Sequence, residues 1–129
     1  MIFLDSSYIK GLILKNDDYN HLSKKIKPYL KHEAKVINTT VLVEVLNAIK
    51  VNNYNQDLNE LISSLVNLDI FDFLVMDDYE KSLEWFSYFN RNINFADCTI
   101  INTMINHKIN KIVSFDSDFD KIRGFERIG

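Results

Sequence analysis

Short apolar runs alternate with amphipathic stretches along the chain, and this alternation predicts an α/β protein. Runs rich in branched and aromatic residues, which are typical of strands buried on both faces, cover 1–4, 34–38, 71–76, 111–115 and, more briefly, 125–128. Apolar residues recur at helical spacing in the stretches between them: 8–14, 19–30, 39–50, 55–68, 79–89 and 94–107. Strands that alternate with helices form a parallel sheet covered on both sides. We therefore predict a single domain over residues 1–129, a three-layer α/β/α sandwich with a central parallel sheet of four or five strands.

Three local features add detail to this outline. Pro28 lies inside a helical stretch and predicts a kink or break there. Asp77 followed by Glu80 has the spacing of a capping box, so Asp77 is predicted to cap the helix that follows. The helix over 39–50 is apolar almost all round, and we predict that it is buried.

Four acidic residues occupy positions where charge is unexpected. Asp5 and Asp116 each follow an apolar strand, so both should emerge at the carboxyl edge of the sheet, where open α/β sheets keep their sites. Glu44 and Asp97 each lie in a predicted helix with no other charged residue within five positions on either side. At helical spacing, Asp97 shares the face that should point at the sheet.

A buried carboxylate without a partner costs several kcal/mol, so each of these acids needs compensation. Taken singly, Asp5 and Asp116 are equally well explained as helix caps, and Glu44 as a residue at a helix–helix seam with a remote lysine. The alternative is that the acids converge on shared cations. Asp97 is the hardest to explain singly, and the four lone acids together favour the shared site.

A shared site has a definite chemistry. Carboxylates about 4 Å apart repel each other by roughly 4 kcal/mol per pair at an effective dielectric constant near 20, so full ionisation requires a divalent ion among them. Oxygen ligands without suitably spaced His or Cys select Mg²⁺ or Mn²⁺ over zinc. The chemistry that fits such a site is phosphodiester hydrolysis.

Charge and composition narrow the class of protein. The net charge of the chain is −3, but the charge is unevenly distributed: residues 1–51 carry a net charge of +3 and residues 52–101 one of −7. The lysine-bearing amino-terminal half could therefore still bind phosphates. The single cysteine, Cys98, allows no internal disulfide, and neither a secretory signal nor a membrane span is visible, so a cytoplasmic protein is expected. Three glycines are too few for a Gly-rich phosphate loop.

Four acidic motifs occur in the order that is typical of PIN domains: Ile2-Phe3-Leu4-Asp5-Ser6-Ser7, Val41-Leu42-Val43-Glu44-Val45-Leu46-Asn47, Phe95-Ala96-Asp97-Cys98 and Val113-Ser114-Phe115-Asp116-Ser117-Asp118-Phe119. The chain resembles PIN domains over essentially its whole length. In the order, spacing and length of these motifs it resembles the VapC-type toxins of toxin–antitoxin pairs.

The resemblance implies a PIN-like fold and a Mg²⁺- or Mn²⁺-dependent endoribonuclease that cleaves RNA with metal-activated water. It also implies a homodimer that a small antitoxin protein neutralises. Carried over by position, the acids that would bind metal and act in catalysis are Asp5, Glu44, Asp97 and Asp116. Candidate supporting residues are Ser6, Ser114 and Asp118, of which Asp118 has no assigned role.

Two rival interpretations remain open at this stage. The first is a catalytically silent PIN-like module that binds protein or RNA; the presence of all four acids argues against a decayed site. The second is a Mg²⁺-dependent phosphatase with an aspartyl nucleophile. Such phosphatases carry the motif Asp-x-Asp after the first strand, whereas Asp5 is followed by Ser6 and Ser7.

Overall fold

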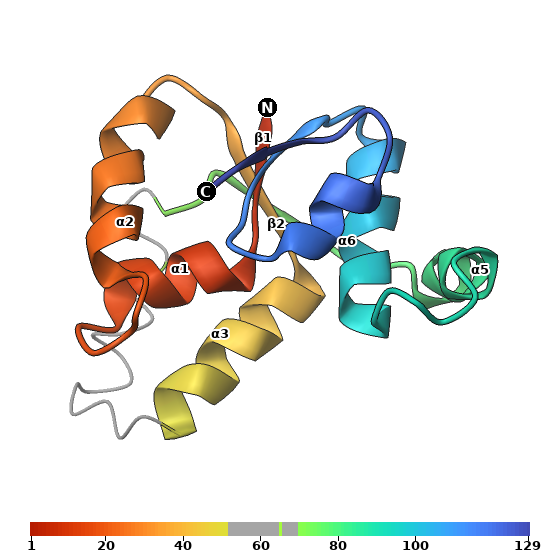
Figure 1. Ribbon diagram of the computed structural model, residues 1–129, viewed down its shortest axis with the longest axis horizontal. Helices are drawn as coiled ribbons and strands as arrows, with labels where there is room; N and C mark the ends of the chain where they lie inside the picture. Colours follow the sequence, from red (N-terminus) through yellow and green to blue (C-terminus); the bar gives the residue numbers. More distant parts are fainter. Residues whose placement is uncertain (52–64, 66–69) are drawn as a thin grey trace.

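The computed structural model describes residues 1–51, 65 and 70–129, and five strands in this part of the chain form one sheet (Figure 1). The strands are β1 (Ile2–Leu4), β2 (Lys35–Asn38), β3 (Phe73–Val75), β4 (Lys111–Val113) and β5 (Glu126–Ile128). Their order is β3-β2-β1-β4-β5 and every pairing is parallel. The central position of β1 explains why its three residues are all buried.

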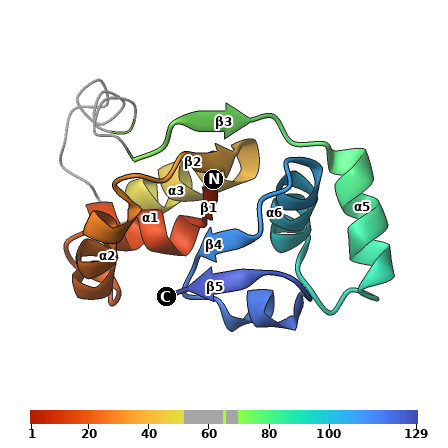
Figure 2. The same cartoon turned by 90° about the horizontal axis from the view of Figure 1, so that it is seen from above.

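Helices cover both faces of the sheet, as the sequence predicts. Their bounds are α1 (Ser6–Ile13), α2 (Asn20–Ile26), α3 (Thr39–Val51), α5 (Tyr79–Tyr88) and α6 (Phe95–Asn106), with 3₁₀ turns η1 (Lys27–Leu30) and η2 (Ser117–Lys121). Figure 2 shows α1 and α2 on one side of the sheet and α5 and α6 on the other. The three-layer α/β/α sandwich is therefore confirmed. None of the described helices is both long and apolar enough to cross a membrane.

Two helix predictions meet different outcomes. Pro28 lies at the start of η1, where the α-helical hydrogen bonding of α2 gives way to a 3₁₀ turn, so the predicted break is present. The helix predicted over 55–68 falls outside the described residues, apart from Leu65, which is buried.

The prediction that Asp77 caps α5 is wrong by one residue. Asp78 is the cap, and its Oδ1 accepts a hydrogen bond from the backbone N–H of Lys81 at 3.0 Å. Asp77 instead accepts hydrogen bonds from the backbone N–H and the hydroxyl of Thr40, and its own N–H donates to the hydroxyl of Thr39 at 3.1 Å. Asp77 thus ties the segment after β3 to the first turn of α3.

The prediction that α3 is buried is wrong for the outer side of the helix. Val41, Val45 and Ile49 form its buried stripe, but Val43 is 53% exposed and Leu46 is 36% exposed. The reason is the position of α3, which leaves the end of β2 and contacts α1 and α6, so that its outer side has no described neighbour.

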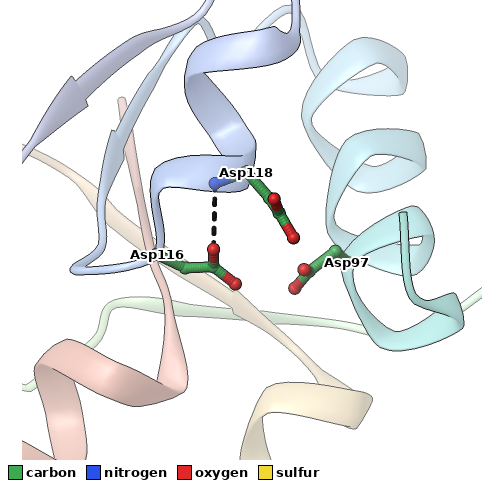
Figure 3. A group of neighbouring side chains, drawn as sticks. All are labelled: Asp97, Asp116 and Asp118. Atoms are coloured by element: carbon green, nitrogen blue, oxygen red, sulfur yellow. Dashed lines mark hydrogen bonds between the residues drawn. The ribbon is translucent and has the colours of Figure 1, made fainter. Parts of the chain in front are cut away.

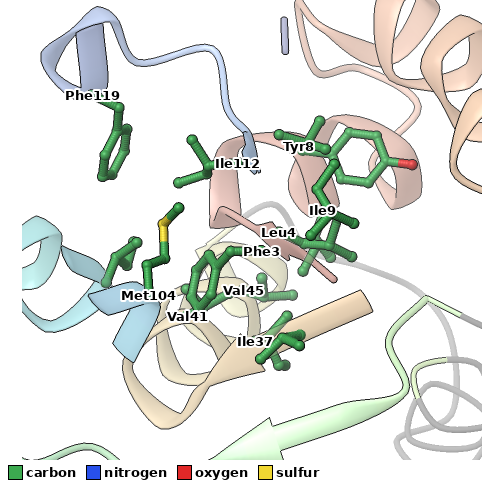
Figure 4. Packing of buried hydrophobic residues seen from close by; sticks show 14 of the residues in the cluster. Phe3, Leu4, Tyr8, Ile9, Ile37, Val41, Val45, Met104, Ile112 and Phe119 are labelled. Atoms are coloured by element: carbon green, nitrogen blue, oxygen red, sulfur yellow. The ribbon is translucent and has the colours of Figure 1, made fainter. Parts of the chain in front are cut away.

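The core joins the strands to the helices that carry the acids. Phe3 and Ile112 project from the neighbouring strands β1 and β4 on one face of the sheet and pack with Val41 of α3 and Met104 of α6, as Figure 4 shows. Close packing of this kind resists small displacements, because interiors have few voids to absorb them. The core therefore fixes α3 and α6 relative to the ends of β1 and β4.

Asn38 adds a buried polar link between the same elements. It lies at the end of β2 with no exposed surface, and its Oδ1 accepts a hydrogen bond from the N–H of Val41 in the first turn of α3 at 3.0 Å. Its amide group donates to the hydroxyls of Thr99 and Thr103 on α6 at 3.3 and 3.2 Å. One side chain thus connects the strand to the two helices.

Asn38→Ala should lower the free energy of unfolding by about 2–3 kcal/mol, because it leaves the buried N–H of Val41 without its partner and removes the hydrogen bonds to α6. Urea denaturation measures this change. Asn47→Ala, which alters an exposed residue of α3, is the matched control and should change the free energy by less than about 0.5 kcal/mol. Equal effects of the two variants would contradict the role given to Asn38.

Candidate active site

The acids are brought together at the carboxyl edge of the sheet. Asp5 directly follows β1 and caps α1, while Asp116 follows β4 and caps η2. The two strand ends are aligned, because β1 pairs with β4 and the N–H of Asp5 donates to the carbonyl of Val113 at 3.0 Å. Asp97 lies in the first turn of α6, which begins near this edge.

Three carboxylates approach one another most closely. Asp97, Asp116 and Asp118 each offer an oxygen, and these three atoms all lie within 4.8 Å of one another (Figure 3). Asp116 Oδ1 accepts a hydrogen bond from the N–H of Asp118 at 2.9 Å, which turns the 3₁₀ segment so that both side chains face α6. Like charges at this separation repel strongly unless a cation or a proton is present.

Asp97 is buried and carries an electrostatic penalty. Only 6% of the residue is exposed, and no donor among the described residues reaches its buried Oδ2. Burial raises the pKa of Asp97 to about 8, and the neighbouring charges of Asp5, Asp116, Glu44 and Asp118 add to this rise. Without a cation in the site, Asp97 therefore holds a proton at neutral pH.

Asp5 is buried as deeply but is well supplied with donors. Its Oδ1 accepts from the N–H of Ser6 at 2.8 Å, and its Oδ2 accepts from the hydroxyls of Ser7 at 2.9 Å and Ser114 at 2.6 Å. Burial raises the pKa of Asp5, and these hydrogen bonds oppose the rise. Asp5 is thus fixed in orientation, whereas Asp97 has a free oxygen.

Two serines join Asp5 to the loop that carries Asp116. The Ser114 hydroxyl accepts a hydrogen bond from the N–H of Asp116 at 3.0 Å, and the Ser7 hydroxyl accepts one from the N–H of Phe115 at 3.0 Å. Sequence reasoning named Ser114 but missed the role of Ser7. The Ser6-Ser7 doublet was visible, but which hydroxyl faces the loop depends on the rotation of α1.

Glu44 lies at the side of this group, on α3. It is half-buried, and burial followed by the charge of Asp5 raises its pKa, while Lys10 and a hydrogen bond from the Ser6 side chain oppose the rise. Ser6 and Lys10 lie one turn apart on α1, so both belong to the face of α1 near α3. Lys10 is a cation near the acids that sequence reasoning did not single out.

The candidate residues therefore fall into two sets, which differ in how closely their carboxylates approach one another. Asp97, Asp116 and Asp118 converge within metal-ligand distance of one another, and Asp5 and Glu44 flank them. Asp118 also pairs with Lys121, whose Nζ lies 2.8 Å from its Oδ1. The sequence left the role of Asp118 open because its side-chain direction depends on the η2 turn.

The arrangement fits a hard divalent cation. The ligand atoms are all carboxylate oxygens, one of them buried without a partner, and a cation would remove the mutual repulsion. Mg²⁺ and Mn²⁺ suit such an oxygen-only set better than zinc, which favours His and Cys ligands.

Comparison with known families decides the class of protein. The sequence model of the PIN domain matches residues 2–124, which include every acid described above. The chain belongs to the PIN domain family. No protein among the curated sequences that were compared matches this PIN domain.

Solved structures show the same fold. This PIN domain superposes on VapC20 of Mycobacterium tuberculosis, a toxin described as cleaving the sarcin–ricin loop, with a TM-score of 0.75, 20% identity and 94% of each chain covered. It also superposes on FitAcB from Neisseria gonorrhoeae with a TM-score of 0.72 and 16% identity, covering 100% of this chain and 97% of the other. The predicted PIN-like architecture is confirmed.

In EDTA, raising the pH from 5 to 8 should destabilise the wild type more than Asp97→Asn. The unfolded chain loses the Asp97 proton near the ordinary aspartate pKa of 3.8, whereas the folded protein keeps it until the pKa of about 8. Folding therefore retains a proton over this interval, and stability falls as pH rises through it, by on the order of a few kcal/mol. Urea denaturation at both pH values gives the change in the free energy of unfolding with pH for each protein. Parallel pH profiles would show that Asp97 titrates normally.

Mn²⁺ should raise the melting temperature of the wild type by mass action. Asp118→Asn should lose most of this increase, because it removes one of the three converging carboxylates. Asp120→Asn is the matched control, since Asp120 lies in the same turn but pairs with Arg127 at 2.9 Å. Mn²⁺ should raise the melting temperature of Asp120→Asn as much as it raises that of the wild type, each measured relative to the same protein without Mn²⁺. A full Mn²⁺ effect in Asp118→Asn would remove Asp118 from the site.

Proposed function

We propose that this PIN domain is a Mg²⁺- or Mn²⁺-dependent endoribonuclease and the toxin of a toxin–antitoxin pair. The observation that carries the proposal is the convergence of Asp97, Asp116 and Asp118, with Asp97 Oδ2 buried and without a partner among the described residues. Such a group is unfavourable for folding alone, so its retention points to a ligand. Membership of the PIN family and a fold shared with VapC20 support a nuclease.

Asp97, Asp116 and Asp118 would hold the metal. When bound, it would activate water and stabilise charge on the phosphate and on the leaving oxygen. Binding requires the Asp97 carboxyl to release its proton, which the raised pKa makes favourable only when a cation replaces it. Asp5 orients the loop of Asp116 through Ser7 and Ser114.

Of the four acids expected from the sequence, Glu44 lies beside Asp97, while Asp118 joins Asp97 and Asp116 in place of Asp5 in our proposal. Glu44 is half-buried, its carboxylate is held by Ser6, and its charge acts on Asp97. We assign it to orienting the attacking water or completing the metal shell. The water oxygen bonds to phosphorus and gives up one proton, while the P–O3′ bond breaks and O3′ takes up one proton, which leaves a 5′-phosphate and a 3′-hydroxyl.

The proposed partners are an RNA substrate, a small antitoxin and a second copy of the chain, with action in the cytoplasm. Exposed apolar side chains support a protein partner, because edge strand β3 presents Phe73 and Leu74, and Met76, Tyr79 and Leu83 follow it. Apolar residues grouped in this way on a surface mark sites of protein association.

Purified protein should cut total cellular RNA into discrete fragments with Mn²⁺ and none with EDTA. Asp97→Asn should reduce the cleavage rate by about 100-fold or more. Substitution of residues that only hydrogen-bond to a metal ligand already lowers activity by roughly 10- to 100-fold. Asp120→Asn, which is outside the converging group, should retain cleavage. Gel electrophoresis with end-group analysis measures both the rate and the termini.

Folded protein that binds Mn²⁺ but leaves RNA intact would contradict the nuclease and favour the catalytically silent binding module. Cleavage that persists unchanged in Asp97→Asn would instead point to a contaminating nuclease.

A further inference from the structure

Two aromatic rings are stacked beside the acidic site. The ring centroids of Tyr19 and Phe115 are 4.2 Å apart and their planes differ by 5°. Other ring pairs in the described part of the chain are 5.0–6.0 Å apart, and most are tilted or edge-on. Tyr19 keeps 41% of its surface exposed, although Phe115 covers one face of its ring.

The stack is joined directly to the acids. Phe115 lies between Ser114 and Asp116, and its N–H donates to the Ser7 hydroxyl, which in turn donates to Asp5. The position of the Phe115 backbone is therefore set by the same hydrogen bonds that orient Asp5. Phe115 itself is half-buried, so Tyr19 is the more open member of the pair.

Tyr19 is held in place from the side of α1. A Cβ at Gly11 would lie 3.2 Å from Tyr19 Cβ and 3.1 Å from its carbonyl oxygen, so the absence of a side chain there permits the close approach. The N–H of Tyr19 donates to Asp17 Oδ1 at 2.9 Å, and the Asn20 side chain donates to the Gly11 carbonyl at 2.8 Å. Ser7 and Gly11 share one face of α1, so that face positions both rings.

We propose that Tyr19, supported by Phe115, is a stacking platform for an unpaired base of the RNA next to the scissile phosphate. An aromatic ring with an open face binds any base through its π surface, which suits single strands whose bases are free. A rigid support increases the affinity for the base, because the ring loses little side-chain entropy when the base binds. This inference rests on the proposed ribonuclease activity and adds to it a residue that binds a base beside the acids.

Lys10 is a cation near the acids. It lies on the same face of α1 as Ser6, follows Ile9 and precedes Gly11 in the sequence, and acts on Glu44 at the site. A lysine there can neutralise a backbone phosphate while the base stacks on Tyr19.

Binding of fluorescein-labelled oligoadenylate RNA tests the platform without cleavage. All proteins carry Asp97→Asn, which relieves repulsion at the site, and are kept in EDTA so that hydrolysis is suppressed; fluorescence anisotropy gives the affinity. Tyr19→Leu should weaken binding by roughly 5- to 100-fold, whereas Tyr19→Phe should stay within about twofold. Tyr29→Leu is the matched control, because Tyr29 is 85% exposed and lies on η1, away from the stack, and it should leave binding unchanged.

A second oligomer of equal length and charge, with abasic sugars in place of nucleosides, separates stacking from structural effects. Tyr19→Leu should not change binding to this oligomer. Equal loss on both oligomers, or no loss on oligoadenylate, would overturn the platform while leaving the nuclease in place. Failure of the Tyr19-containing protein to bind either oligomer would overturn RNA as the substrate and the platform with it.

Discussion

Repulsion among carboxylates at one edge of the sheet is the constraint on which the rest of the structure depends. Asp97, Asp116 and Asp118 meet within 4.8 Å, and the pKa of Asp97 rises to about 8 because burial and its neighbours disfavour the charge. A chain selected for stability alone would replace such residues, since small domains have only about 5–15 kcal/mol of stability. The surrounding core and hydrogen bonds hold the acids in place in spite of this penalty, in an arrangement that could bind a metal ion.

The rigidity comes from two kinds of contact. Apolar side chains such as Phe3 and Met104 pack the strands against α3 and α6, while Asn38 connects the same elements through polar contacts. At the edge itself, Ser7 and Ser114 place the loop of Asp116 relative to Asp5. The acids therefore cannot move apart to relieve their repulsion, and a proton or a cation has to do so.

Much of the fold could be predicted because burial on both faces gives the central strands a continuous apolar pattern, as in Ile2–Leu4. The position of Asp5 and Asp116 at the same edge of the sheet could also be predicted, because both follow strands of a parallel sheet. Asp77 and Asp78 could not be separated, because either can cap a helix and two helix starts compete for them. The exposed Val43 and the inward turn of Asp118 depend on which elements meet, which no local pattern records. Side-chain direction was likewise invisible for Ser7 and Tyr19.

The most direct test of a metal site at this edge is diffraction from crystals grown with Mn²⁺, with data collected to locate its anomalous signal. We expect a peak about 2.1 Å from oxygens of Asp97, Asp116 and Asp118, with Asp97 Oδ2 among the ligands. A site that stays empty at saturating Mn²⁺, or an ion bound elsewhere on the protein, would contradict it.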